Sequence, residues 1–173
     1  MQIRYLESAD REPLGRFLER IPEADRTFFK EDVDDPGVVD RWLAPGPVHA
    51  VAVEDGAVVG WLSLVPLHGW SSHVVEVRLI VDPARRGRGI GRALARRAVV
   101  EAFELGATKM VVEVIAVQDS TIAMFRSLGF DPEALLSDHV RDRSGELRDL
   151  MVLSHSVQEQ WSAMITAGLA DDS

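Results

Sequence analysis

The chain has 173 residues, which suits one domain large enough to bury a full hydrophobic core. Its residues are 46% apolar and 27% charged, with neither an apolar run of the roughly 20 residues that cross a bilayer nor a signal segment, so we expect a cytoplasmic protein without a membrane partner. The net charge of −9 argues against a nucleic-acid partner, and the lack of cysteine excludes disulfides and thiol catalysis.

The N-terminal part of the chain alternates between strand and helix patterns. Residues 2–7 predict a strand, and Ser8 is expected to cap a helix that runs to about Arg20. Residues 22–45 are acidic and interrupted by proline, which predicts one or two short helices. The apolar segments 48–54 and 57–65 then flank Asp55-Gly56, a strong signal for a β-hairpin with a two-residue turn.

The second half continues the pattern to the end of the domain. We expect a strand at 73–81, a helix at 89–105, a strand at 108–117, a helix at 120–128 and a closing hairpin of 130–140 and 146–153. The β-branched run at 108–117 predicts a central strand covered on both faces. A single domain is therefore expected over residues 1–155, followed by a C-terminal helix and frayed tail at 156–173.

The segment after the strand at 73–81 is expected to bind an anion. It passes through Asp82-Pro83 into glycines 87, 89 and 91 and then directly into a helix, so backbone N–H groups can converge on one ligand. The first helical turn adds unpaired N–H groups and the positive end of its dipole. Residues 78–97 also carry seven arginines and one aspartate, a basic island in an acidic chain. We expect a pyrophosphate pocket surrounded by arginines 85, 86, 88, 92, 96 and 97, with a solvated helix face as the alternative for 96 and 97.

The spacing of the glycines indicates which anion binds. A P-loop needs Lys-Ser or Lys-Thr after its last glycine, whereas Arg-Ala follows here, and a dinucleotide turn has G-x-G-x-x-G rather than G-x-G-x-G. The pattern present is R-x-x-G-x-G at Arg86, Gly89 and Gly91, preceded by L-x-V-x-P at residues 79–83. This combination resembles the acetyl-CoA turn of the GNAT superfamily of N-acetyltransferases.

A second segment carries the same resemblance. Residues 118–130 read QDSTIAMFRSLGF, similar to the family's N-x-x-A-x-x-x-Y-x-x-x-G-F, with Gln118 in place of the usual Asn and Phe125 in place of the usual Tyr. Over residues 2–153 the resemblance implies an α/β (α+β) fold, a mixed, mostly antiparallel sheet of six to seven strands with helices on both faces and a splayed cofactor site. It implies acetyl-CoA as co-substrate, held by Leu79, Ile80, Val81, Arg86, Gly87, Arg88, Gly89, Ile90, Gly91, Arg92, Gln118 and Phe125.

Transfer of an acetyl group to an amine requires a group that takes the amine's proton, because a free alkyl amine has a pKa near 10.4. Glu76 is the candidate catalytic base, since it lies among three valines where desolvation is expected to raise its pKa toward neutrality. The alternative is a structural carboxylate paired with Arg78. His73 is a competing base, and Glu113, within an apolar strand, is expected to be functional or paired with an arginine. The other histidines lack metal-ligand spacing, so no metal site is expected.

The resemblance also implies how the thioester is held and cleaved. The N–H of Leu79 or Ile80 would meet the thioester carbonyl where the sheet splays, and Val81 would bond the pantetheine arm as an added strand does. The family's Tyr donates a proton to the departing sulfur. Phe125 has no proton to give, so the thiolate would leave unaided, through water or with another donor such as Ser120.

Acceptor recognition is expected to fall to the acidic N-terminal helices, the turn at 66–70 with Trp70, and the closing hairpin with Asp138 and His139. Trp42 and Trp61 could also line the pocket, although the core is the favoured place for Trp61. We predict an enzyme that moves acetyl from acetyl-CoA to the amine of a small-molecule or amino-acid-like acceptor by direct attack in a ternary complex. A non-catalytic acyl-CoA sensor or partner subunit, or a protein N-terminal or lysine acetyltransferase, are the alternatives. A homodimer is compatible with the sequence.

Overall fold

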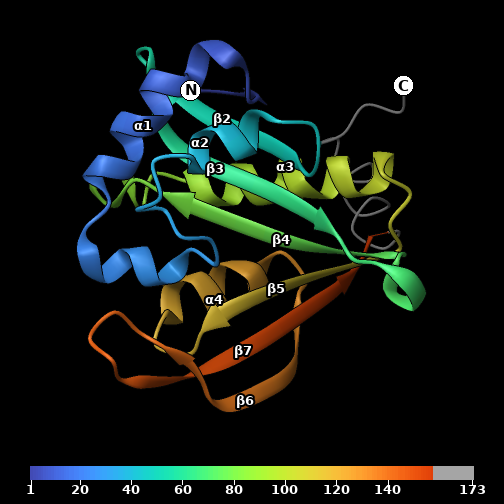
Figure 1. The fold of residues 1–173 in the computed structure, drawn as a ribbon. Coiled ribbons are helices and arrows are strands. Elements are labelled where there is room, and N and C mark those ends of the chain that lie inside the picture. The colour runs from blue at the N-terminus through green and yellow to red at the C-terminus, as the bar shows by residue number, and fades with distance from the viewer. Residues whose placement is uncertain (158–173) are drawn as a thin grey trace.

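The computed structural model describes residues 1–157, which form a seven-stranded sheet in the order β1-β2-β3-β4-β5-β7-β6 (Figure 1). Neighbouring strands are antiparallel except β4 and β5, which run parallel. The strands are β1 (Gln2–Tyr5), β2 (Val48–Glu54), β3 (Ala57–Pro66), β4 (Val74–Val81), β5 (Lys109–Ile115), β6 (Asp131–Arg141) and β7 (Leu147–Ser156). The predicted mixed, mostly antiparallel sheet is confirmed, and β5 is an interior strand as predicted. The expectation that both of its faces are covered is wrong, because Lys109, Val111 and Glu113 on one face are only half-buried.

The helices cover both faces of the sheet (Figure 1). They are α1 (Arg11–Arg20), α2 (Val38–Leu43), α3 (Ile90–Glu104) and α4 (Asp119–Ser127), with 3-10 turns η1 (Ser8–Asp10), η2 (Glu23–Phe28), η3 (Gly69–Ser71) and η4 (Pro83–Arg85). None of the helices in the described part of the chain is long and apolar enough to cross a membrane.

Two expected element ends differ in the structure. Ser8 does not cap α1 but begins η1, because Asp10 accepts the Glu7 N–H at 2.9 Å and closes a separate turn before the helix. At the other end, Ser156 is the last residue of β7 and pairs with Lys109, so it is not the start of a helix. The rest of the predicted C-terminal helix and tail, from residue 158 on, lies outside the described residues.

Each face of the sheet has its own hydrophobic core. On one face α3 and α4 pack through residues such as Leu94 and Phe125 onto Met110 and Leu153, all of them buried. On the other face α1 and α2 cover a second cluster that includes Phe17 and a stacked Trp42–Trp61 pair with ring centroids 4.4 Å apart. Because both faces are covered, the sheet holds its strands in fixed register.

The sheet opens between β4 and β5, as the family resemblance implies. The two strands pair only from Val74 to Val77 on β4 and from Lys109 to Val112 on β5. Beyond these positions β4 continues to Val81 and β5 to Ile115 without facing one another in the ladder. Backbone groups on the inner edge of β4 are therefore available to a ligand that enters the opening.

Candidate active site

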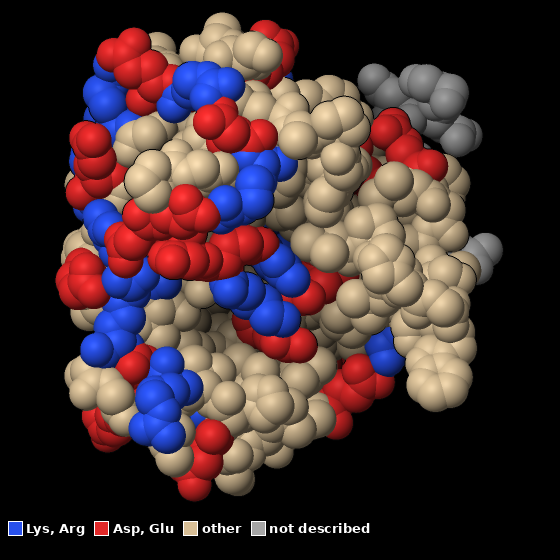
Figure 2. All heavy atoms as spheres, viewed as in Figure 1, with Lys and Arg blue, Asp and Glu red and all other residues tan. Residues whose placement is uncertain are grey.

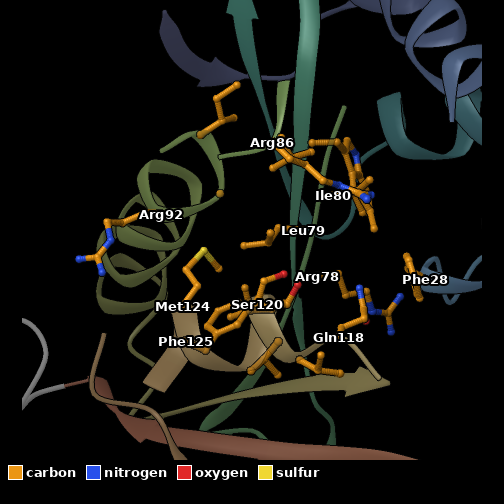
Figure 3. Close-up of a pocket in the computed structure, with 18 of the residues that line it drawn as sticks. Phe28, Arg78, Leu79, Ile80, Arg86, Arg92, Gln118, Ser120, Met124 and Phe125 are labelled. Atoms are coloured by element: carbon orange, nitrogen blue, oxygen red, sulfur yellow. The ribbon is translucent and has the colours of Figure 1, made fainter. Parts of the chain in front are cut away.

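The opening in the sheet leads into a cavity of about 750 Å³ (Figure 3). It reaches from the glycine-rich turn and α4 across β4 and β5 to the segment around Phe28 and Lys30. Eleven of the twelve residues predicted to hold acetyl-CoA line it. They are Leu79, Ile80, Val81, Arg86, Gly87, Gly89, Ile90, Gly91, Arg92, Gln118 and Phe125.

Arg88 is the predicted residue that lies outside the cavity. Its side chain turns instead toward the β2–β3 hairpin, where Nη1 lies 3.5 Å from the Glu54 carboxylate. The Arg88 side chain therefore lies away from the cavity, and a contact between Arg88 and the co-substrate stays a prediction. Arg86 lines the cavity and Arg88 does not, a difference that the R-x-x-G-x-G spacing alone does not predict.

The glycine turn has the conformation that an anion-binding site needs. Asp82 begins it by accepting the Ala84 N–H at 3.0 Å and the Arg20 Nε–H at 2.9 Å. Gly87 and Gly89 have φ values of 75° and 84°, a left-handed conformation that favours glycine. A Cβ at either position would meet no atom within 4 Å, so their backbone lies open to an approaching group. Since Gly89 is the N-cap of α3, the N–H groups of the first helical turn point out from the same place.

Only some of the arginines near the glycine turn line the cavity. Arg86 lines the cavity with its guanidinium 2.8 Å from Asp25 of η2. Arg92 donates from α3 to Ser127 Oγ of α4 at 2.5 Å, and its guanidinium points away from Leu79 and Met124 (Figure 3). Arg97 belongs to another cluster, where it bonds buried Glu101 and stacks 4.9 Å over the Tyr5 ring. Neither Arg96 nor Arg97 is among the described residues that line the cavity. The ring of positive charge is thus smaller than the sequence suggested.

The strand register separates the two predicted N–H donors on β4. The Asp82 N–H donates to the carbonyl of Val59 on β3, and the Val74 carbonyl accepts from the Leu67 N–H. The backbone N–H and C=O groups of the even-numbered β4 residues therefore point to β3. The His73 carbonyl accepts from the N–H groups of Thr108 and Lys109, so the backbone groups of the odd-numbered residues point to the β5 side. The N–H of Leu79 and both backbone groups of Val81 therefore point into the opening, whereas the N–H of Ile80 points to β3.

At the far end of the cavity a lysine joins the two splayed strands. Lys30 Nζ lies 2.7 Å from Glu76 Oε1 on β4 and 2.7 Å from Glu113 Oε2 on β5. Arg78 holds the other side of Glu76, with Nε 3.0 Å from Oε1 and Nη2 3.1 Å from Oε2, and it also pairs with Glu31. Three carboxylates and two cations thus share this end of the cavity, which leaves a net charge of −1. Figure 2 shows charged side chains of both signs gathered on the left side of this face, over the N-terminal helices.

The structure corrects the expected ionisation of Glu76. Burial raises the pKa of this carboxyl, as expected, but the hydrogen bonds from Arg78 and Lys30 outweigh it and leave the pKa below its ordinary value. Burial lowers the pKa of Lys30, yet its bonds to Glu113 and Glu76 raise it above the ordinary value. Both shifts favour the charged forms of Glu76 and Lys30 at neutral pH. Glu113 has the predicted ionic partner, but the partner is Lys30 rather than an arginine.

Most of the other residues predicted for catalysis or acceptor recognition lie outside the cavity lining. His73 is exposed at the entrance to β4, and Trp70 is 97% exposed on η3; neither is among the residues that line the cavity. Asp138 and His139 are also absent from the lining; both are exposed, within the part of β6 where its register with β7 shifts. Trp61 lies in the core, as favoured, and also reaches the cavity wall, whereas Trp42 is buried behind it.

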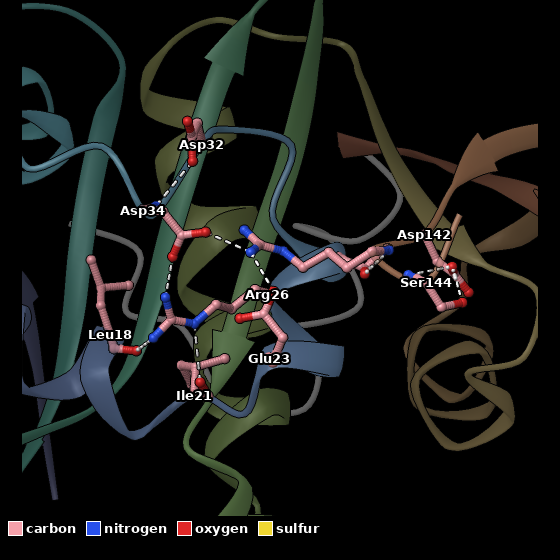
Figure 4. A network of polar contacts seen from close by, with 10 residues as sticks. Leu18, Ile21, Glu23, Arg26, Asp32, Asp34, Asp142 and Ser144 are labelled. Atoms are coloured by element: carbon pink, nitrogen blue, oxygen red, sulfur yellow. Dashed lines mark hydrogen bonds and ion pairs between the residues drawn. The ribbon is translucent and has the colours of Figure 1, made fainter. Parts of the chain in front are cut away.

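The segment that carries Lys30 is fixed to the rest of the protein by a second polar network (Figure 4). Arg143, in the β6–β7 turn, donates to Glu23 of η2 at 2.8 Å and pairs with Asp34, which Arg26 also contacts. The turn itself is closed by Asp142, whose pKa is lowered to about 2 by bonds from Ser144 and Arg148. These ion pairs join the segment around Lys30 to the β6–β7 turn.

The comparison with known proteins decides the family. The model of the Acetyltransferase (GNAT) family matches residues 14–130, about two thirds of the chain. The chain belongs to the GNAT acetyltransferase family. This confirms the predicted family, fold class and enzyme class, an acyltransferase. No cluster of potential metal ligands was found among residues 1–157 of this GNAT protein.

Named relatives are similar over most of the domain. The GNAT protein is 30% identical over 109 residues to YjgM, an uncharacterized N-acetyltransferase of Escherichia coli, covering 62% of this chain and 65% of YjgM, just under two thirds. It is 30% identical over 122 residues to MnaT of the same organism, named an L-amino acid N-acyltransferase, covering 69% and 70% of the two chains. The solved structure of YncA from Salmonella typhimurium, determined with acetyl-CoA, superposes with a TM-score of 0.71 at 24% identity, over 90% of this chain and 93% of that one.

Proposed function

We propose that this GNAT protein is a cytoplasmic N-acetyltransferase that moves an acetyl group from acetyl-CoA to the amine of a small-molecule or amino-acid-like acceptor. The observation that carries the proposal is one continuous cavity with a glycine-rich turn at one end and a cluster of acidic and basic side chains at the other. The first end suits the pyrophosphate and the second end suits an amine. The name of MnaT, an L-amino acid N-acyltransferase, supports an amino-acid-like acceptor.

The residues of this chain fit acetyl-CoA as a bound co-substrate. The open backbone at Gly87 and Gly89, the start of α3 and Arg86 would hold the pyrophosphate. Val81 would pair with the pantetheine arm through its free N–H and C=O, and Leu79 would donate its N–H to the thioester carbonyl oxygen. Acetyl-CoA would supply the activated acetyl group, and these residues would hold and orient it.

The acceptor amine is assigned to the carboxylates of Glu76 and Glu113. An ammonium there would replace Lys30 as their counter-ion, and Glu76 would take its proton as the amine attacks. Arg78 or the displaced Lys30 can meet the carboxylate of an amino-acid-like acceptor. In this proposal the amine attacks the thioester directly within a ternary complex, without an acyl-enzyme.

The open acceptor end favours an enzyme over a non-catalytic sensor. The cavity continues past Leu79 to Glu76 and Glu113, so an amine can approach the thioester once it displaces the Lys30 ammonium from these carboxylates. A panel of amino acids, other small amines and short peptides, assayed for release of free CoA, tests the proposal. We expect at least one small amine to be acetylated; release by peptides alone would move the function to protein acetylation, and no release by any amine would favour the sensor.

Phe125 provides a test of how the thiolate leaves. Its ring is 1% exposed, lines the cavity and packs edge-to-face on Phe130 with centroids 5.1 Å apart. A thiol with a pKa near 8.5 leaves passably as the anion, so a missing proton donor is tolerable. Phe125→Tyr is expected to speed single-turnover acetyl transfer by about tenfold or less (~1.4 kcal/mol), because amine attack shares control of the rate. A loss of about tenfold or more would show that Phe125 is a packing residue whose ring edge must stay dry.

A further inference from the structure

Lys30 has the position of an acceptor amine. Its Nζ lies 2.7 Å from both Glu76 and Glu113, the carboxylates that the proposed function assigns to the substrate ammonium. The side chain lines the same cavity as the glycine turn and is 42% exposed, so solvent and ligand can reach it. The chain has only two lysines, and the other, Lys109, pairs with Glu133 at 2.5 Å and is absent from the described cavity lining.

We propose that Lys30 is an internal acceptor, acetylated in cis on Nζ by acetyl-CoA bound in the same cavity. This inference rests on the proposed function, because it uses the same thioester and the same N–H donor. The Lys30 ammonium loses a proton to Glu76, which passes it to solvent. The neutral amine then attacks the thioester carbonyl carbon, so an N–C bond forms and the C–S bond breaks. CoA leaves as thiolate, the acetylated nitrogen loses its second proton to solvent, and the thiolate takes up one proton from solvent, so the net products are the acetamide, CoA–SH and one released proton.

The fold brings the lysine and the thioester site together before reaction. Lys30 follows η2, and that segment is fastened to the β6–β7 turn through Arg26, Asp34 and Arg143 (Figure 4). Its flexible four-carbon stem lets Nζ swing from the carboxylates toward Leu79. Leu79 follows Val75 and Val77 in the series of β4 residues whose backbone groups point to the β5 side. Fixing the two reactants in one cavity replaces a bimolecular encounter with an intramolecular step.

The charge cluster makes this reaction slow and dependent on pH. Glu76 and Glu113 keep Lys30 protonated, so the reactive neutral form is scarce at neutral pH and becomes more abundant as the pH rises. An external amine at the same carboxylates competes with Lys30. Once acetylated, Lys30 can no longer neutralise the two carboxylates. The net charge of this end of the cavity, counted with Glu31 and Arg78, then changes from −1 to −2, and the acceptor end becomes more attractive to cationic amines.

The test is peptide mass spectrometry of the full chain incubated with acetyl-CoA alone, following acetylation at Lys30 and Lys109. Lys30 is expected to react at least about tenfold faster than Lys109, to saturate with acetyl-CoA, and to keep the same first-order rate constant when the protein is diluted. Lys30→Arg, which keeps a cation between the carboxylates, should abolish the gain of an acetyl group at this position and leave Lys109 unchanged. Gly91→Asp, which alters the proposed pyrophosphate site, should slow Lys30 acetylation at least about tenfold without changing Lys109.

Each result separates this inference from the proposed function. If calorimetry shows that acetyl-CoA binds and external amines are acetylated, but Lys30 reacts no faster than Lys109, the internal acceptor is overturned and the proposed function stands. A rate constant that falls on dilution would overturn the cis reaction. If acetyl-CoA does not bind at all, both proposals are overturned together.

Discussion

Replacing Glu76 by glutamine is expected to slow amine acetylation at least about 100-fold at neutral pH, the low end of the range for loss of a general base. The affinity for acetyl-CoA should stay within about threefold (~0.7 kcal/mol), because the glycine turn and the inner edge of β4 are untouched. The amide keeps the shape of the side chain but cannot take a proton. Steady-state kinetics with an accepted amine and calorimetry with acetyl-CoA measure the two effects separately.

A matched substitution shows whether the effect belongs to the site. Glu101 is a second buried glutamate, 2% exposed on α3, bonded to Arg97 and Tyr5 and absent from the described cavity lining. Glu101→Gln should therefore change stability without a comparable loss of rate. Normal turnover by Glu76→Gln would place the base elsewhere, and Glu113 would be tested next because it shares Lys30 with Glu76.

The pH dependence follows from the direction of the Glu76 shift. Its folded pKa lies below the ordinary carboxyl value, so its bonds to Arg78 and Lys30 stabilise the fold at higher pH and are lost as the pH falls through the folded pKa. Glu76 thus stays ionised between about pH 6 and 9, since an ordinary glutamate titrates near 4.3. Over this range kcat/KM should rise as the acceptor amine loses its proton, with no acidic limb from Glu76.

Local patterns were enough to predict most of the fold. Asp55-Gly56, the β-branched run of β5 and the glycines before α3 each specify backbone conformation within a short window, and the structure has the expected element at each place. The splay between β4 and β5 came from the family resemblance rather than from any local signal.

The acceptor end of the site depends on contacts that no short window contains. Lys30 and Glu76 are 46 positions apart and meet only because the segment after η2 crosses the sheet. The valines around Glu76 indicated its burial, but not the two cations that reverse the effect of burial on its pKa. Trp70 was expected at the pocket from its place in a turn, yet that turn projects into solvent. Turn chemistry fixes the backbone without fixing which side of the molecule a side chain faces.

Gly91→Asp is expected to stay folded and to lose at least about 2 kcal/mol of acetyl-CoA affinity, about 30-fold. Gly91 lies in the first turn of α3, and a Cβ there would come 3.2 Å from Met124 Sδ and 3.6 Å from Val81 Cγ2. The end of the Met124 side chain is flexible and can move by the small amount required. The new carboxylate is favourable for the helix itself, because it meets the positive end of the helix dipole. The carboxylate would also repel a pyrophosphate, because both anions would occupy the same N–H groups at the start of α3.

Two further variants separate charge from bulk and from helix propensity. Gly91→Ala adds the same Cβ without the charge, so it should lose much less affinity than Gly91→Asp. Gly15→Asp places the same residue in α1, where a Cβ meets no atom within 4 Å, and it should leave acetyl-CoA affinity unchanged. Calorimetry on each folded variant gives the affinities, and thermal unfolding shows whether the fold is retained. A folded Gly91→Asp protein that binds acetyl-CoA as tightly as the parent would remove the glycine turn as the pyrophosphate site, because a carboxylate and a pyrophosphate cannot both occupy the N-terminus of α3 without a large electrostatic cost.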